Sequence, residues 1–99
     1  MRGLTVIVAT DDAARFQTAL TLASAHAALG GRTRLYLNEG AARLLGEQER
    51  FTTVRELGVT LIACQTGLAD AGLALPEGVE AGGIVSLLAD LGDDRLVTV

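Results

Sequence analysis

The side chain with the clearest chemical potential is the single cysteine, Cys64. It follows the apolar run 59–63 and precedes Gln65, Thr66 and Gly67, a pattern typical of a strand that passes directly into a helix. Backbone N–H groups at a helix start stabilise negative charge, and a cysteine placed there has a lowered pKa. Two interpretations stay open for Cys64: a reactive thiolate, or a small side chain packed in the core.

The single histidine, His26, is not expected to act on Cys64. Hydrolysis by a thiolate requires a histidine beside it. His26 falls near the end of the first predicted helix, which in a parallel α/β unit lies at the opposite edge of the sheet from the strand ends. We therefore expect a half-buried or interface histidine on a helix stripe with Leu22 and Leu29. Transfer of sulfane sulfur through a persulfide needs no base, only an accessible thiolate.

Polar residues also follow the first two predicted strands. Thr10 or Asp11 is expected to cap the first helix, and Asp12 to favour its first turn. Asn38 and Glu39 end the second strand and should line the same edge of the sheet as Cys64. A metal ion held by Asp11, Asp12 and Glu39 is a weaker alternative, and we expect no metal site.

Glycine pairs suggest close packing rather than nucleotide binding. Gly82 and Gly83 precede the last predicted helix, but the glycine fingerprints of dinucleotide-binding folds and P-loops are absent. We expect Gly83 to line a pocket beside Cys64. Ser86 has no neighbouring base in the sequence and is not expected to be a nucleophile.

Composition limits the function classes. The 99 residues are 49% hydrophobic and 20% charged, which indicates one globular domain spanning residues 1–99. A net charge of −4, with arginine the only basic residue type besides the one histidine, opposes binding to nucleic acid, and only three aromatic residues are present for base stacking. We expect no membrane span and no signal peptide. A single cysteine cannot form an intramolecular disulfide and suits the reducing cytoplasm.

Strand-like and helix-like segments alternate along the chain. The expected strands are 4–9, 33–37, 59–63, a short one near Val79 and 96–99, and the expected helices are 12–29, 41–45, 51–57, 68–71 and 81–91. The last helix is expected to bury one face formed by Ile84, Val85, Leu88 and Leu91. This alternation predicts an α/β fold: a single compact domain with a four- to five-stranded, mostly parallel sheet and helices on both faces.

For the strand order we expect a flavodoxin-like arrangement, with the first strand between the second and the third. In such sheets the site lies at the carboxyl ends of the strands, where the strand order reverses. This order would bring Thr10 and Asp11 to the same crevice as Cys64.

Segment 58–67, which ends in Cys64-Gln65-Thr66-Gly67, resembles the DsrE/DsrF-like family. The Cys-Gln-Thr tripeptide is the most specific element. The glutamate and glycine at 39–40 after the second strand, Gly72, and the glycine pair at 82–83 also fit. The resemblance implies a compact DsrEFH-like α/β fold, frequent homo-oligomers, and relay of sulfur as a persulfide on Cys64, in complexes with related subunits.

These observations favour a cytoplasmic sulfur carrier or sulfurtransferase-like protein that acts through Cys64, and they leave open whether it is an enzyme. The residues expected to line its pocket are Thr10, Asp11, Asn38, Glu39, Gln65, Thr66, Gly67 and Gly83. We expect no cofactor and no membrane or nucleic-acid partner. A homo-oligomer, dimer or trimer, and sulfur donor or acceptor proteins are the expected partners. The alternative is a non-catalytic, homo-oligomeric module that binds a small ligand or a protein and in which Cys64 is structural.

Overall fold

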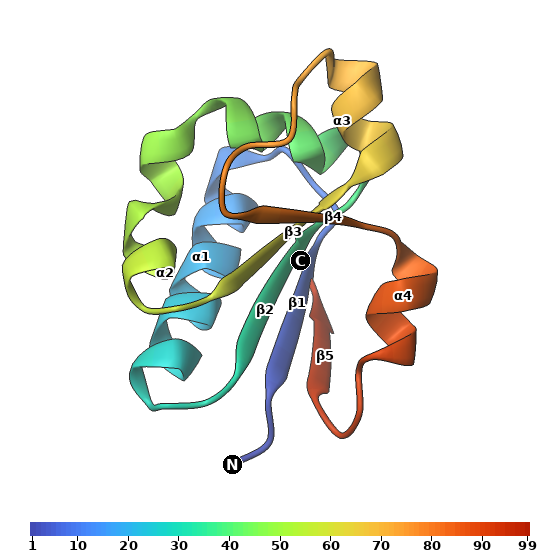
Figure 1. Cartoon of the computed structure of the whole chain (residues 1–99). Coiled ribbons are helices and arrows are strands. Elements are labelled where there is room, and N and C mark those ends of the chain that lie inside the picture. The colour runs from blue at the N-terminus through green and yellow to red at the C-terminus, as the bar shows by residue number, and fades with distance from the viewer.

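Apolar and β-branched runs form the centre of a parallel sheet in the computed structural model, which describes all 99 residues (Figure 1). In chain order the elements are β1 (Leu4–Val8), α1 (Ala13–Ala28), β2 (Thr33–Leu37), the 3-10 helices η1 (Glu39–Gly46) and η2 (Gln48–Phe51), α2 (Thr52–Glu56), β3 (Thr60–Cys64), α3 (Gln65–Ala71), β4 (Val79–Gly82), α4 (Ile84–Ala89) and β5 (Arg95–Thr98). The predicted α/β fold with a single sheet is confirmed.

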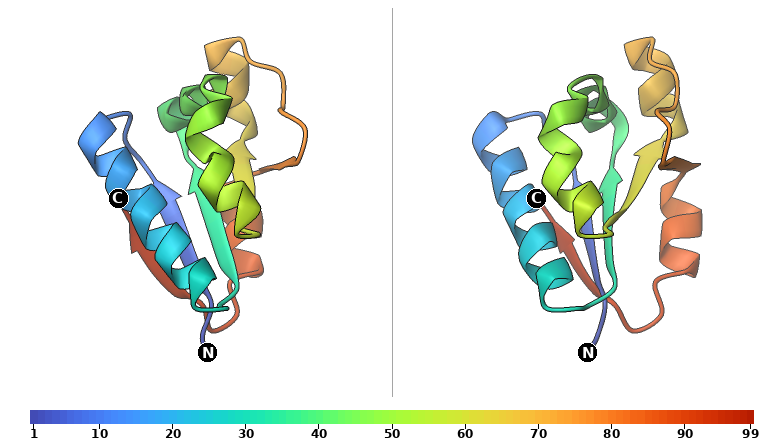
Figure 2. Two further views of the ribbon diagram at one scale, coloured as in Figure 1. Left: turned by 90° about the vertical axis from the view of Figure 1, so that its left-hand side faces the viewer. Right: turned by 60° about the vertical axis from the view of Figure 1, so that its left-hand side comes forward.

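The five strands are arranged in the order β4-β3-β2-β1-β5, and every neighbouring pair is parallel. From β1 to β4 the chain moves in one direction across the sheet. The connection through α4 then returns past β3, β2 and β1 to β5. Because such crossovers are right-handed, α1 and α2 cover one face and α4 lies against the other, which Figure 2 shows from two sides. The predicted helices on both faces are therefore confirmed.

The expected position of the first strand is wrong, because β2 and not β1 lies next to β3. The reason lies in the connection from β2 to β3. Phe51 of this connection packs against Phe16 of α1, with the ring centroids 5.5 Å apart. A right-handed crossover on the face that α1 already covers must carry the chain further from β1. Thr10 and Asp11 at the end of β1 are consequently separated from Cys64 by a whole strand.

Most of the core lies between the sheet and the α1 side. A cluster of 20 buried residues fills this layer, and its largest members include Phe16, Leu35, Leu37 and Phe51. The α4 side holds a second, smaller cluster. Its five members are Ile7, Tyr36, Ile62, Cys64 and Leu87.

Asp12 is the residue that caps α1. Its Oδ1 accepts a hydrogen bond from the backbone N–H of Arg15 at 2.9 Å, while Thr10 Oγ1 accepts one from the N–H of Asp12 at 3.0 Å. The prediction that Thr10 or Asp11 caps the helix is therefore wrong by one or two positions. Thr10 instead orders the turn that leads into the cap.

The last helix buries a different face from the one expected. Leu87 is its buried residue, whereas Ile84, Val85 and Leu88 are 37%, 85% and 46% exposed. The segment 79–82 is taken up by β4, so that α4 has only six residues and sets one side chain against the sheet. The other apolar residues of α4 face outward. None of the helices combines the length and the apolar character needed to cross a membrane.

Candidate functional site

Cys64 is the last residue of β3 and the N-cap of α3. Its backbone is extended, with φ −63° and ψ 120°, and its Sγ accepts a hydrogen bond from the N–H of Gly67 at 3.4 Å. The predicted position of the thiol at a strand-to-helix junction is thus confirmed. The residue is 9% exposed, so only a small part of it reaches solvent.

Tyr36 is the second side chain of the candidate site, and sequence reasoning missed it. It lies on β2 opposite Ile62 of β3, which places its side chain on the α4 face, the face shared by Ile62 and Cys64. Its hydroxyl acts on the Cys64 thiol and helps to lower the pKa of that thiol. Tyr36 is 1% exposed, and burial therefore fixes its ring.

Burial acts to raise the pKa of the Cys64 thiol, but the hydrogen bonds around the sulfur outweigh it. The backbone N–H groups of Gly67, Glu39 and Thr66 and the hydroxyl of Tyr36 all favour the thiolate, and the net pKa is lowered. No cation is needed for this effect. The site therefore holds more thiolate at neutral pH than an ordinary cysteine does.

The same arrangement keeps the phenol of Tyr36 protonated. Burial, followed by its hydrogen bond to Cys64 and the negative charges of Cys64 and Glu39, raises the pKa of Tyr36 to about 12. The two shifts have opposite directions because the proton stays on the oxygen while the charge stays on the sulfur. Tyr36 therefore remains a donor across the pH range in which Cys64 ionises.

The backbone at Glu39, which lines the same cavity as the thiol, is strained. Its φ of 45° lies in the left-handed region, which residues with a side chain adopt rarely, often at functional sites. Gly67 on α3 lies directly against this turn, because a Cβ added to Gly67 would overlap the carbonyl oxygen of Glu39. The glycine thus allows α3 and η1 to approach closely beside the sulfur, which accepts a hydrogen bond from the N–H of Gly67.

Cys64 opens onto a cavity of about 890 Å³ at the carboxyl ends of the strands. Six of the predicted pocket residues line it with Cys64: Asn38, Glu39, Gln65, Thr66, Gly67 and Gly83. Tyr36, Asp70 and Ser86 also contribute to its wall. The only ionisable side chains besides Cys64 and Tyr36 are the carboxylates of Glu39 and Asp70, so this end of the cavity is acidic.

Thr10 and Asp11 do not line this cavity, which corrects their predicted role. They line a smaller pocket of about 300 Å³ on the other side of Asn38 and Glu39. Asp11 Oδ2 lies 4.0 Å from Arg43 Nη1, and both side chains are largely exposed. The strand order accounts for the separation, because β2 lies between β1 and β3.

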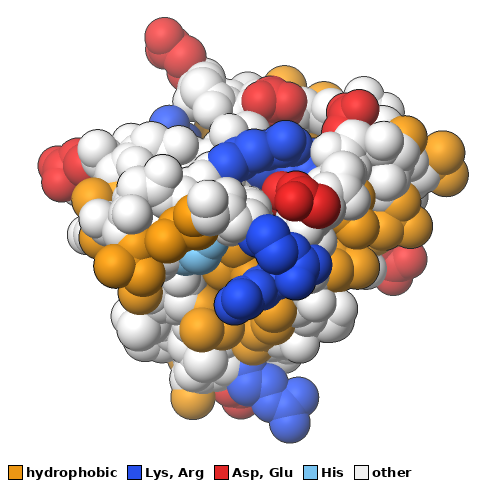
Figure 3. Space-filling view, turned by 90° about the horizontal axis from the view of Figure 1, so that it is seen from below, with side chains coloured by type: hydrophobic (Ala, Val, Ile, Leu, Met, Phe, Trp, Pro, Cys, Tyr) orange, Lys and Arg blue, Asp and Glu red, His pale blue; other side chains and the backbone are white.

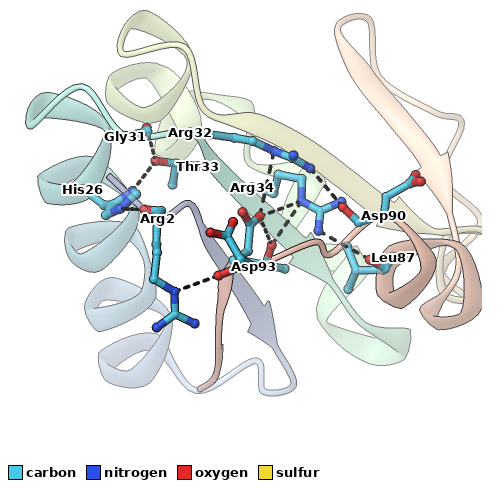
Figure 4. A network of polar contacts seen from close by, with 11 residues as sticks. Arg2, His26, Gly31, Arg32, Thr33, Arg34, Leu87, Asp90 and Asp93 are labelled. Carbon is cyan, nitrogen blue, oxygen red and sulfur yellow. Dashed lines mark hydrogen bonds and ion pairs between the residues drawn. The ribbon is translucent and has the colours of Figure 1, made fainter.

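His26 lies at the opposite end of the molecule, as predicted. Its Nδ1 is 2.9 Å from Thr33 Oγ1 and its Nε2 is 3.0 Å from the carbonyl oxygen of Arg2, as Figure 4 shows. The ring therefore joins the end of α1 to the starts of β1 and β2. No group of three His, Cys, Asp or Glu side chains is placed to hold a metal ion.

Comparison with known proteins does not assign the chain to a family. Neither the models of known protein families nor the curated protein sequences contain a match to this chain.

Proposed function

We propose that the protein carries sulfane sulfur as a persulfide on Cys64, in the manner of the DsrE/DsrF-like proteins that its Cys-Gln-Thr segment resembles, in a reducing compartment such as the cytoplasm. The observation that carries the proposal is a sulfur at the wall of a cavity that accepts a hydrogen bond from the N–H of Gly67, in surroundings that lower the pKa of its thiol. A core cysteine needs no such surroundings. A sulfur that holds negative charge does.

The chemistry follows from the lowered pKa of the thiol. The Cys64 thiolate attacks the outer sulfur of a donor persulfide R–S–SH, the S–S bond of the donor breaks, and R–S⁻ leaves. Cys64 then carries the outer sulfur as Cys–S–SH. In the second half, an acceptor thiolate attacks that outer sulfur and the Cys64 thiolate leaves. A low pKa helps here too, because a more stable thiolate is a better leaving group. No net oxidation or reduction takes place.

The test is mass spectrometry of the intact protein after incubation with a sulfane-sulfur donor. The wild-type protein is expected to gain the mass of one sulfur atom, which a reductant removes. Cys64→Ser should gain none while it keeps the circular-dichroism spectrum and the melting temperature of the wild type. An equal gain of sulfur in Cys64→Ser would exclude this function.

The low exposure of Cys64 favours a second candidate, a binding module in which the thiol is only packed. The two candidates differ in the reactivity of the native thiol. A carrier thiol reacts with an alkylating reagent in the folded protein, and its rate falls as the pH drops below the lowered pKa. A packed thiol reacts only after unfolding, in which case the cavity would serve a ligand without sulfur chemistry.

We also propose that the chain forms a homo-oligomer through α4. Val85, Leu88 and Ile84 are exposed there, and Leu96 of β5 is 44% exposed. A symmetric contact between two copies would cover these side chains. Light scattering should give at least twice the chain mass for the wild type and the single-chain mass for Val85→Glu, and a monomeric wild type would contradict the proposal.

A further inference from the structure

The cavity at Cys64 continues along the α4 side of the sheet. A second cavity of about 420 Å³ shares four lining residues with it: Ala81, Gly82, Gly83 and Ser86. From there it extends along Ile62 and Thr60 of β3, and Leu87 of α4 also lines it. The two cavities thus form one groove, with the thiol at one end and the amino-terminal ends of the strands at the other.

Two arginines close the far end of this groove. The side chain of Arg34 is only 7% exposed; its Nε donates to Thr5 Oγ1 at 3.0 Å and lies 3.7 Å from Asp94 Oδ2. Arg34 Nη2 is 3.4 Å from the carbonyl oxygen of Leu87 in α4. Arg32 lies beside it, with Nε 3.8 Å from the same oxygen of Asp94. Figure 4 shows this network, and Figure 3 shows arginine side chains on both sides of an acidic one at this end of the molecule.

The pair carries more positive charge than its protein partners neutralise. Asp94 is the one carboxylate in ion-pair contact with either guanidinium, and the two arginines share it. The backbone carbonyl oxygen of Asp90 accepts a hydrogen bond from Arg32 Nη2. The carboxylate of Asp90 points away from the two arginines in Figure 4. Arg34 Nη1 has no acceptor in the protein. Every fully buried side-chain nitrogen of the protein has a hydrogen-bond partner, so Arg34 Nη1 is not fully buried. This nitrogen therefore reaches the surface, and Arg34 lines the groove.

The spacing between the thiol and the arginines sets the length of a ligand. Arg34 pairs with Thr60, which lies four residues before Cys64 on β3, a separation of about 13 Å along the strand. Glu80 of β4 lies between these levels on the edge of the groove, and Glu39 and Asp70 lie at the thiol end. A short anionic donor would place its charge against these carboxylates. A ligand whose carboxylate is remote from its sulfur avoids them and reaches the arginines.

We infer that this groove selects a peptide-sized thiol or persulfide that carries a carboxylate, with its sulfur at Cys64 and its carboxylate at Arg32 and Arg34. The inference rests on the proposed function, from which it takes the transfer of sulfane sulfur to Cys64. The transfer step is the one written above, with R–S⁻ the thiolate of the peptide. The arginines bind and orient the donor and take no part in the exchange of sulfur.

The test compares rates of sulfur loading from two donors: glutathione persulfide and the persulfide of glutathione glycine ethyl ester. We expect the wild type to prefer glutathione persulfide over the ester about fivefold, the size expected for a charge-assisted contact at a partly exposed arginine. Arg32→Gln should abolish this preference by lowering the rate with glutathione persulfide to the rate with the ester. Arg95→Gln removes an exposed arginine of β5 outside the groove and should retain the preference.

A second measurement separates this inference from the proposed function. S-methylglutathione, which cannot transfer sulfur, is titrated into Cys64→Ser and followed by NMR. Shifts in groove residues that disappear in Arg32→Gln/Cys64→Ser support the groove even if the wild type never gains sulfur. If the wild type gains sulfur but neither Arg32→Gln nor esterification changes the rate, the carrier function stands and the peptide-binding groove is wrong.

Discussion

The two faces of the sheet differ in what holds them together. On the α1 side, 20 buried residues form one continuous apolar layer, in which Phe16 and Phe51 pack and the guanidinium of Arg50 lies 4.6 Å from the ring centroid of Phe16. On the α4 side, five residues form the apolar cluster, and a polar network joins Thr5, Arg34 and Asp94 beside it. The cysteine, the tyrosine that binds it and the groove all belong to the α4 side.

This difference indicates a division of roles within one small sheet. Apolar burial is the dominant favourable contribution to folding, and it is concentrated on the α1 side. A buried ion pair contributes little net stability, because removing both charges from water costs about as much as their attraction returns. The α4 side therefore has room for a cavity and for polar groups, since the opposite layer supplies most of the stability.

The largest expected effect tests the apolar layer. Phe16→Ala should lower the free energy of unfolding by about 3–5 kcal/mol, because it removes a fully buried ring from the α1 side. Leu87→Ala on the α4 side should cost about 2 kcal/mol, the low end for such a change, because its cavity joins the groove and can fill with water. Urea denaturation measures both. A loss for Leu87→Ala equal to that for Phe16→Ala would remove the distinction between the faces.

An intermediate effect is expected from the buried network. Asp94→Asn should cost about 3 kcal/mol, because Arg34 loses its only carboxylate partner while it remains buried. The double variant Arg34→Met/Asp94→Leu removes both charges and should recover most of that loss. Urea denaturation of the single and the double variant measures both losses. Equal losses for both variants would show that the network, and not the unpaired charge, matters for stability.

A change at Tyr36 should have the smallest effect on stability and the clearest effect on the pKa of the Cys64 thiol. Tyr36→Phe removes a hydroxyl that favours the thiolate, so the pKa of Cys64 should rise while the free energy of unfolding changes by about 1 kcal/mol. The folded protein favours the thiolate, so the stabilisation is present above the ordinary cysteine pKa and is lost as the pH falls through the lowered value. Thiolate absorbance as a function of pH measures the shift. An unchanged pKa in Tyr36→Phe would show that the backbone N–H groups suffice.

The phenol provides the reciprocal measurement. Tyr36 is the one tyrosine in a chain without tryptophan, so its phenolate absorbance can be read without interference. It should titrate near the pKa of about 12, and in Cys64→Ser the pKa should fall but stay above 10.0 because the ring remains buried. Since the fold favours the neutral phenol, this contribution is complete below pH 10 and is lost as the pH rises toward 12. An identical value in both proteins would contradict the coupling between Tyr36 and Cys64.

Local patterns predicted the elements but not their neighbours. The strand at 33–37 has the expected bounds, and β3 and β5 differ from their expected ranges by one residue at each end. The strand order could not be read in the same way. It depends on which face the connection from β2 to β3 covers, and that is decided by contact between Phe51 and Phe16. Apolar residues in short helices do not show in the sequence which layer they will join.

The candidate site shows the same limit. The position of Cys64 and the proximity of Thr66 and Gly67 follow from a few consecutive residues, and they could be predicted. Tyr36 could not, because a tyrosine within an apolar strand resembles any other core residue. Its role arises from the register that places Tyr36 opposite Ile62, two residues before the thiol. The left-handed turn at Glu39 had no sequence signal either, since glycine and not glutamate is the usual residue there.

The pairing of β1 with β5 has a consequence for the order in which the molecule assembles. Leu4 pairs with Thr33 in β2 but also with Arg95 in β5, near the other end of the chain. Closing the larger loop costs more entropy, so β5 and the helix that leads to it should join last and detach first. Hydrogen exchange should therefore be faster in α4 and β5 than in β1 and β2. Such partial opening would uncover the α4 side while the α1 layer stays folded. It would expose the thiol of Cys64, which is 9% exposed in the folded protein, to its reactants.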